Sequence, residues 1–173
     1  MSRALRIIAA VLLLSAAAYS PHAVGARAVA RERPAGDARR ESLALIVNRA
    51  NPVEELSFEE LRQYFLGERT HWPNGRRVTL VMRDAARPER DAVLRLVYEM
   101  REQDFHAHFL RARFTGELPE EPRQLDTASR VNNFVFLQPG ALAYVRAADA
   151  APSVKVLRLD GLLPGDPGYK LTF

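Results

Sequence analysis

Three short apolar segments constrain the fold of this chain more than any other feature. They are Leu43–Asn48 (LALIVN), Val78–Met82 (VTLVM) and Ala141–Val145 (ALAYV), and stretches with helical spacing separate them. A last segment, Val154–Leu159, predicts a further and peripheral strand. Strands that alternate with helices predict an α/β domain of at most three layers. The length of 173 residues leaves room for one such domain.

The helix predicted after the first strand has clear start and stop signals. Ser57 is a candidate N-cap, and Glu60 three residues later completes a capping box. Phe58, Leu61 and Phe65 share one face at helical spacing. Gly67 suits the left-handed residue that ends a helix. Trp72 then precedes a Pro-Asn-Gly turn, and we expect it to pack over the end of this helix instead of stacking on a ligand.

Three more helices are expected. Pro88 suits the first position of one, where its missing N–H is no loss. Asp126 or Thr127 can cap the last, which Pro139-Gly140 ends, and Thr115–Pro122 is expected to be a loop. The inward-facing residues are predicted to be Val93, Leu96, Val97 and Met100 in the first, Phe105, Phe109 and Ala112 in the second, and Val131, Phe134 and Val135 in the third.

The N-terminal region has the layout of a secretory signal peptide over residues 1–26. Arg3 and Arg6 precede the apolar run Ile7–Ala18, and small residues at Val24 and Ala26 fit a cleavage site. An uncleaved N-terminal anchor is the alternative. Residues 27–41, rich in Arg and Ala, predict a disordered linker, and the α/β domain is expected over residues 42–173. This order predicts a periplasmic or secreted protein with no membrane span after leader removal.

The charge of the chain is concentrated in its N-terminal region. Of 25 Lys and Arg and 21 Asp and Glu, seven Arg but only two acids precede Glu41, which leaves 18 basic and 19 acidic residues in the rest. A nucleic-acid-binding domain needs an excess of positive charge on the folded part. The sequence therefore predicts no nucleic-acid partner.

Motifs for catalysis or metal binding are weak. His106 and His108 are two residues apart on a predicted helix, so they face different directions and make a poor metal pair. The chain has no cysteine, no P-loop, no dinucleotide-binding glycine motif and no serine in a nucleophile-elbow context. We therefore expect no enzyme activity, no metal and no cofactor.

Several short motifs in a fixed order resemble the phosphate ABC transporter substrate-binding proteins, especially short secreted single-lobe members. The resemblance covers roughly residues 43–145. Its most specific parts are Asn51-Pro52, the Leu-Ser-x-x-Glu-Leu segment ending in Phe65-Leu66-Gly67, Trp72-Pro73-x-Gly75, Phe114-Thr115-Gly116, and Pro139-Gly140-Ala141 before Tyr144. It implies one lobe of a type II periplasmic binding protein, with a small mixed sheet flanked by helices, and a role in transport.

The resemblance also implies a ligand site at the helix that Pro88 opens. In full-length phosphate binders, an Arg after the preceding strand and a Ser-Gly-Thr run at the helix start grip the anion. Here Arg83 keeps the first position and Asp84 follows it, but Arg87-Pro88-Glu89 replaces the hydroxyls and the glycine. The predicted ligand-binding residues are Arg83, Asp84, Arg87, Glu89 and Arg90.

Three interpretations of this substituted site stay open. Glu89 could complement the helix dipole, Arg83 and Arg87 could still hold an oxyanion such as phosphate, or Arg83 could pair with Asp84 or Glu89. The first function hypothesis is a secreted solute-binding-like module with weak or degenerate oxyanion binding. The alternative is an envelope adaptor scaffold without a small-molecule ligand. Because residues 41–173 provide only one lobe, a second lobe or a protein partner would have to cover any bound ligand.

Overall fold

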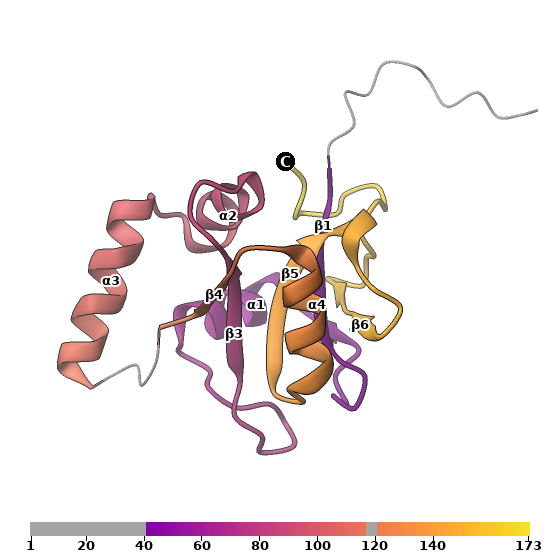
Figure 1. Cartoon of the computed structure of the whole chain (residues 1–173), viewed down its shortest axis with the longest axis horizontal. Helices are drawn as coiled ribbons and strands as arrows, with labels where there is room; N and C mark the ends of the chain where they lie inside the picture. Colours follow the sequence, from indigo (N-terminus) through magenta and orange to yellow (C-terminus); the bar gives the residue numbers. More distant parts are fainter. Residues whose placement is uncertain (1–40, 117–120) are drawn as a thin grey trace, which may run out of the picture. The chain divides into compact units, whose positions relative to one another are not determined.

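The computed structural model describes residues 41–116 and 121–173 (Figure 1), and the predicted signal peptide and residues 27–40 of the predicted linker lie outside this range. Strands and helices alternate along the chain. In order they are β1 (Leu43–Asn48), β2 (Glu55–Leu56), α1 (Phe58–Leu66), β3 (Thr79–Arg83), α2 (Pro88–Val93), the π-helical turn η1 (Leu94–Tyr98), α3 (Glu102–Thr115), β4 (Arg123–Leu125), α4 (Ala128–Leu137), β5 (Ala141–Arg146), the 3₁₀ turn η2 (Ala147–Asp149), β6 (Val154–Val156) and β7 (Arg158–Leu159).

A five-stranded mixed sheet with the order β4-β3-β5-β1-β6 forms the centre of the domain. β3 runs parallel to β4 and β5, whereas β1 is antiparallel to β5 and β6. β2 and β7 form a separate parallel pair. The mixed sheet of a small α/β domain is thus confirmed.

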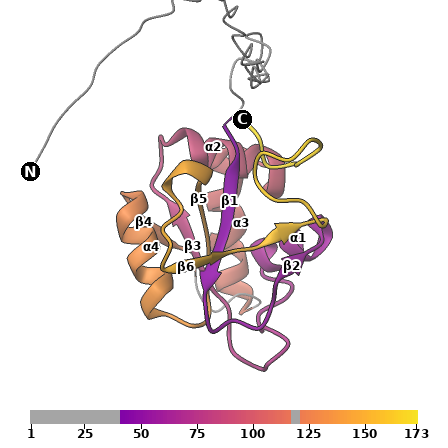
Figure 2. The ribbon, with the colours of Figure 1, turned by 90° about the vertical axis from the view of Figure 1, so that its right-hand side faces the viewer.

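Helices cover both faces of the sheet. This explains why the sequence of β1 is a continuous apolar run. Leu43, Leu45 and Val47 belong to the core on the face of α1, η1 and α3, whereas Ala44 and Ile46 pack on the face of α4. Successive side chains of a strand point to opposite faces, so a strand covered on both sides needs apolar residues at every position. Figure 2 shows α1 and α4 on opposite sides of the sheet.

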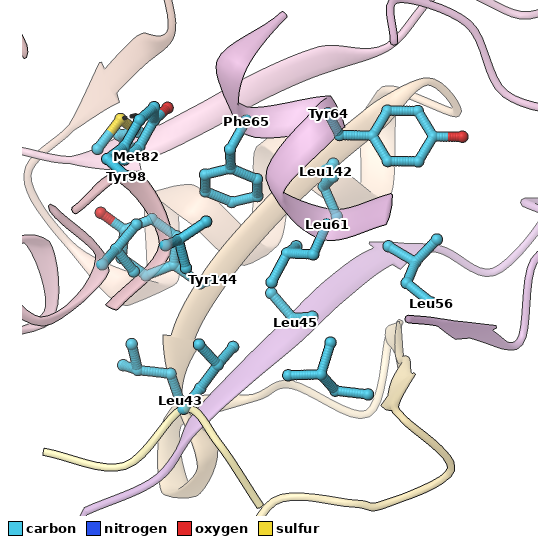
Figure 3. Packing of buried hydrophobic residues seen from close by; sticks show 14 of the residues in the cluster. Leu43, Leu45, Leu56, Leu61, Tyr64, Phe65, Met82, Tyr98, Leu142 and Tyr144 are labelled. Carbon is cyan, nitrogen blue, oxygen red and sulfur yellow. Dashed lines mark hydrogen bonds between the residues drawn. The ribbon is translucent and has the colours of Figure 1, made fainter. Parts of the chain in front are cut away.

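The larger core lies between α1 and the sheet (Figure 3). The side chains of Leu61 and Phe65 reach from α1 toward β1 and β5. Phe65 meets Tyr98 edge-on with ring centroids 5.7 Å apart, and the Tyr98 hydroxyl donates to the Met82 sulfur at 3.6 Å. Aromatic pairs in such tilted arrangements stabilise a core beyond their buried area.

The predicted helix signals are confirmed where the chain provides local chemistry. Ser57 and Glu60 form the capping box of α1, and Gly67 ends that helix at φ 80°. Pro88 is the first residue of α2, and the Thr127 hydroxyl accepts from the Arg130 N–H at the start of α4. Trp72 is buried, as expected.

Other expectations need correction. The helix after Pro88 changes to π-helical geometry at Leu94, so Leu94 and Tyr98 are buried while the predicted Leu96 and Met100 are only half-buried. A π-helical turn inserts a residue into the helical repeat and shifts the inward face. The short strands β2 and β4 were not expected from the sequence. The segment Val154–Leu159 is divided into β6 at the edge of the main sheet and β7 in the small pair.

Candidate functional site

The predicted site lies where β3 and β5 end. Both strands run in the same direction, and the register that pairs Thr79 with Ala141 brings Arg83 and the end of β5 to the same edge of the sheet. A turn with Ala86 in the left-handed region, at φ 61°, then leads to α2. Arg146, the last residue of β5, is therefore beside the residues predicted from the β3–α2 segment.

Glu89 is the centre of this arrangement. Its side chain is buried, and its Oε1 accepts a hydrogen bond from Arg146 Nε at 2.6 Å. Burial alone would raise the pKa of Glu89, but hydrogen bonds from its own backbone N–H and from Arg146, with the charge of Arg83 nearby, hold it below the ordinary value. Glu89 is therefore an anion at neutral pH. Its Oε2 is buried without a hydrogen-bond partner among the described residues.

Arg83 and Asp84 are held to β4 and β5 through the backbone. The Arg83 side chain is buried, and its Nη1 donates to the Leu125 carbonyl at 3.4 Å. The Arg83 N–H donates to the Tyr144 hydroxyl at 3.2 Å, and the Asp84 N–H donates to the Leu125 carbonyl. No ion pair of Arg83 or Asp84 is found within residues 41–116 and 121–173, so the predicted pairing of these two side chains is not seen.

Arg90 has a structural role, because it is buried and paired with Glu102. It is fully buried, and its Nε and Nη2 donate to the two carboxylate oxygens of Glu102 at 2.9 and 2.7 Å. Nη1 donates to the Arg83 carbonyl at 2.9 Å, and the guanidinium lies over the Phe105 ring. This fork geometry matches the two oxygens of a carboxylate. Because Arg90 is fully buried and held by these bonds, it is not accessible to a ligand from solvent and instead joins α2 to α3.

Arg87 precedes α2 as its N-cap residue, but its side chain makes no capping hydrogen bond and is exposed. The structure thus brings together Arg83 and Glu89 from the predicted set. It places Arg87 at the surface and Arg90 in a separate ion pair.

Arg146 lies at the candidate site but was not predicted from the sequence. It links Glu89 at 2.6 Å to Glu41 at 2.9 Å, and its hydrogen bond from Nε to Glu89 raises its own pKa. A signal was present in the sequence, because Arg146 directly follows an apolar strand just as Arg83 follows Val81-Met82. Arg146 and Glu89 are 57 positions apart in the chain. Their proximity depends on the parallel register of β3 and β5, which the sequence does not reveal.

The two arginines around this site, Arg83 and Arg146, favour a negatively charged group between them. In this protein the Glu89 carboxylate is that group.

Among the described residues no group of three or more His, Asp or Glu is placed to hold a metal ion. His106 lies 3.0 Å from Glu102 and takes part in no such group. Within the same part of the chain, no helix is both long and apolar enough to cross a bilayer.

Solved structures with a similar fold include proteins named for phosphate transport or substrate binding. A phosphate transport receptor from Vibrio cholerae matches with a TM-score of 0.57 and 19% identity over 72% of this chain and 48% of its own. PstS from Borrelia burgdorferi matches with a TM-score of 0.61 and 14% identity over 76% and 54%. The described part has the fold of a substrate-binding protein lobe. No model of a known protein family matches the chain.

A third similar structure, from Clostridium perfringens, is described as a phosphate ABC transporter substrate-binding protein and contains bound phosphate. It shares 20% identity over 72% of this chain and 47% of its own, with a TM-score of 0.59. The chain spans about half the length of these structures. The Vibrio cholerae and Clostridium perfringens structures are named as transport or substrate-binding proteins, and none of the three is named as an enzyme. The ligand-binding roles of Arg83, Asp84, Arg87, Glu89 and Arg90 stay predictions.

Proposed function

We propose that this chain is an exported solute-binding-like lobe in which the Glu89 carboxylate takes the place of the bound oxyanion. Oxyanions such as phosphate then bind only weakly at the start of the Pro88 helix. One observation carries the proposal: Glu89 is buried and charged, with its Oε1 on Arg146 and Arg83 nearby. The shared fold with phosphate-binding proteins supports the location, and the leader-like residues 1–26 support export.

Electrostatics explain why phosphate would bind poorly in the native chain. Cationic side chains and free N–H groups at a helix start attract anions. A carboxylate that already accepts these donors neutralises the attraction. In addition, a second anion about 4 Å away would be repelled by about 4 kcal/mol at an effective dielectric constant of about 20. The exposed Arg87 can attract an oxyanion from solution, but exposed charges are screened over about 10 Å in 0.1 M salt.

Removing the Glu89 carboxylate should therefore strengthen phosphate binding. In calorimetric titrations with phosphate and sulfate, we expect the native protein to bind with a dissociation constant of about 1 mM or weaker. Glu89→Thr should bind phosphate at least about tenfold more tightly, because it removes the repulsion and adds a hydroxyl donor. A control is Glu59→Thr, which removes an exposed acid from the first turn of α1 and should leave phosphate binding unchanged.

Replacement of Arg83 tests where the anion binds. Adding Arg83→Ala to Glu89→Thr should remove the gain in affinity, since Arg83 is a buried cation whose charge lies near Glu89 and has no ion-pair partner of its own among the described residues. Phosphate binding by the native protein that survives Arg83→Ala would place the anion site elsewhere. Thermal unfolding with and without phosphate shows that each variant is folded, because a ligand that binds only the native state raises its stability.

An interaction scaffold in the cell envelope, without a small-molecule ligand, is the second candidate. The ion pair of the buried Arg90 with Glu102 and the pairing of Glu89 with Arg146 favour it, because buried and paired side chains are poorly available to a solute. If folded Glu89→Thr binds phosphate no better than the native protein, the oxyanion proposal fails and the scaffold is supported.

A further inference from the structure

A second candidate site is a cavity of about 490 Å³ at the opposite end of β3 from Arg83. β4 pairs only with Val81–Arg83, so the first residues of β3 have no strand on this side. Thr79 and Leu80 line the cavity, and both are partly exposed. β3 is five residues long and rises roughly 3.3 Å per residue, which places this cavity roughly 13 Å from the Glu89 site.

Aromatic side chains from three helices form the walls. Tyr64 comes from α1, Phe109 from α3 and Phe134 from α4. With Val78 and Leu80 they form the apolar part of the lining, and arginine, threonine and other polar residues form most of the rest, so the cavity suits a ligand that is itself part apolar and part charged. Cavities of this volume are typical of sites for small organic molecules.

The polar lining carries an excess of positive charge. Three guanidinium groups, from Arg69, Arg77 and Arg123, line the cavity against the single carboxylate of Glu121. Arg69 is paired with Glu60 at 2.9 Å and lies over the Tyr64 ring. Arg123 lies over the Phe134 ring with its central carbon 4.9 Å from the centroid. Neither Arg77 nor Arg123 has an ion-pair partner in the described ranges 41–116 and 121–173.

We propose that this cavity binds small aromatic carboxylates. The aromatic walls would hold the ring of the ligand. Arg77 and Arg123 would donate to its carboxylate, because a planar guanidinium can make two parallel hydrogen bonds to the two oxygens. The site shares no residue with the Glu89 site and does not depend on the function proposed for it. Its ligand needs both a ring and a negative charge, which distinguishes it from phosphate.

The test uses 2-naphthoate as the probe, with 2-naphthalenemethanol as a neutral analogue and acetate as an anion without a ring. Calorimetry should give a dissociation constant for 2-naphthoate of about 1 mM or tighter and at least tenfold weaker binding of both controls. In NMR titrations the largest shifts of backbone amides should occur at Thr70, Thr79 and Leu80, which line the cavity.

Neighbouring arginines provide a matched pair of variants. Arg77→Gln should weaken 2-naphthoate binding about tenfold, as expected for one lost charge-assisted hydrogen bond. Arg76→Gln should not change it, because Arg76 is exposed and does not line the cavity. Glu89→Thr should also bind 2-naphthoate like the native protein, so the two sites can fail independently. Equal binding of the neutral analogue, equal effects of the two arginine variants, or shifts centred on the exposed Phe114 would overturn the proposal.

Discussion

At the scale of single residues, Trp72 and Gly140 explain why two distant turn motifs belong together. Trp72 Nε1 donates to the Gly140 carbonyl at 3.0 Å across 68 positions, and the same carbonyl accepts from the Thr79 N–H. A Cβ atom at position 140 would lie 2.3 Å from the Arg77 carbonyl oxygen, which only glycine avoids. The Trp72-Pro73 turn and the Pro139-Gly140 turn therefore form one contact that fixes the start of β3 against β5.

Replacement of Trp72 should be strongly destabilising. The side chain is 2% exposed and its ring lies 4.8 Å from that of Tyr64, so Trp72→Ala leaves a large cavity. We expect it to lower the free energy of unfolding by about 3–5 kcal/mol in urea titrations. Trp72→Phe keeps part of the packing and should cost less. An unchanged midpoint for Trp72→Ala would contradict the burial of this residue.

Residue-level predictions from the sequence succeeded where the chemistry is local. The capping box of Ser57 and Glu60 needs only residues three positions apart. The burial of Trp72 followed from the turn beside it. The partner of Glu89 could not be predicted in the same way, because the register of β3 and β5 determines that Arg146 lies beside it. The sequence therefore singled out Glu89, but its ion pair with Arg146 could not be predicted.

At the scale of elements, the segment from Pro88 to Thr115 begins as predicted from the sequence, but its buried face differs from the predicted one. Its start at Pro88 was predicted, since proline at the first helical position has a local cause. The buried stripe was shifted because η1 is π-helical between Leu94 and Tyr98, and the apolar spacing did not reveal that change. The ion pair of Arg90 and Glu102 then joins α2 to α3 across the irregular turn.

This ion pair should make stability depend on pH in the acid range. The hydrogen bond from Arg90 holds the pKa of Glu102 below its ordinary value of 4.5. The stabilisation is therefore fully present above the pKa of the unfolded state and is lost as pH falls through the lower pKa of the folded state. We expect Glu102→Gln to lower the free energy of unfolding at pH 7 by about 3 kcal/mol, because it leaves the buried Arg90 without its counter-charge.

Unfolding in urea at a series of pH values checks this expectation. The difference between the native protein and Glu102→Gln should be largest near neutral pH and should shrink below pH 4.5. Glu59→Gln, an exposed acid on α1, is the control and should change stability by no more than about 0.5 kcal/mol. A difference that stays constant between pH 7 and pH 3 would show that the Arg90 pair does not set the pKa of Glu102.

At the scale of the whole molecule, the two ends of the described chain close the fold on each other. The Glu41 N–H donates to the Phe173 carbonyl and the Phe173 N–H donates to the Glu41 carbonyl, at 3.1 and 2.9 Å. The Leu43 N–H donates to the Leu171 carbonyl, and the Tyr169 hydroxyl donates to the Leu43 carbonyl at 2.8 Å. The segment ending at Phe173 therefore covers the beginning of β1. A mixed sheet flanked by helices could be predicted from the sequence, but this closure could not, because the apolar alternation of Tyr169, Leu171 and Phe173 indicates an extended segment without indicating what it pairs with.

The last prediction concerns the limits of the folded domain. If residues 1–26 are a leader, N-terminal sequencing of the exported protein should find a first residue close to Arg27.

Shortening that protein to begin at Glu41 should leave its unfolding temperature unchanged, because the backbone hydrogen bonds at this end of the domain begin with Glu41 and Leu43. Deletion of residues 169–173 should instead lower the free energy of unfolding by at least about 3 kcal/mol, because Tyr169 and Leu171 are buried and burial of each side chain contributes about 1.5–3 kcal/mol. An exported protein that still begins at Met1 would contradict the leader, whereas a loss of stability on removal of residues 27–40 would move the domain boundary toward the N-terminus.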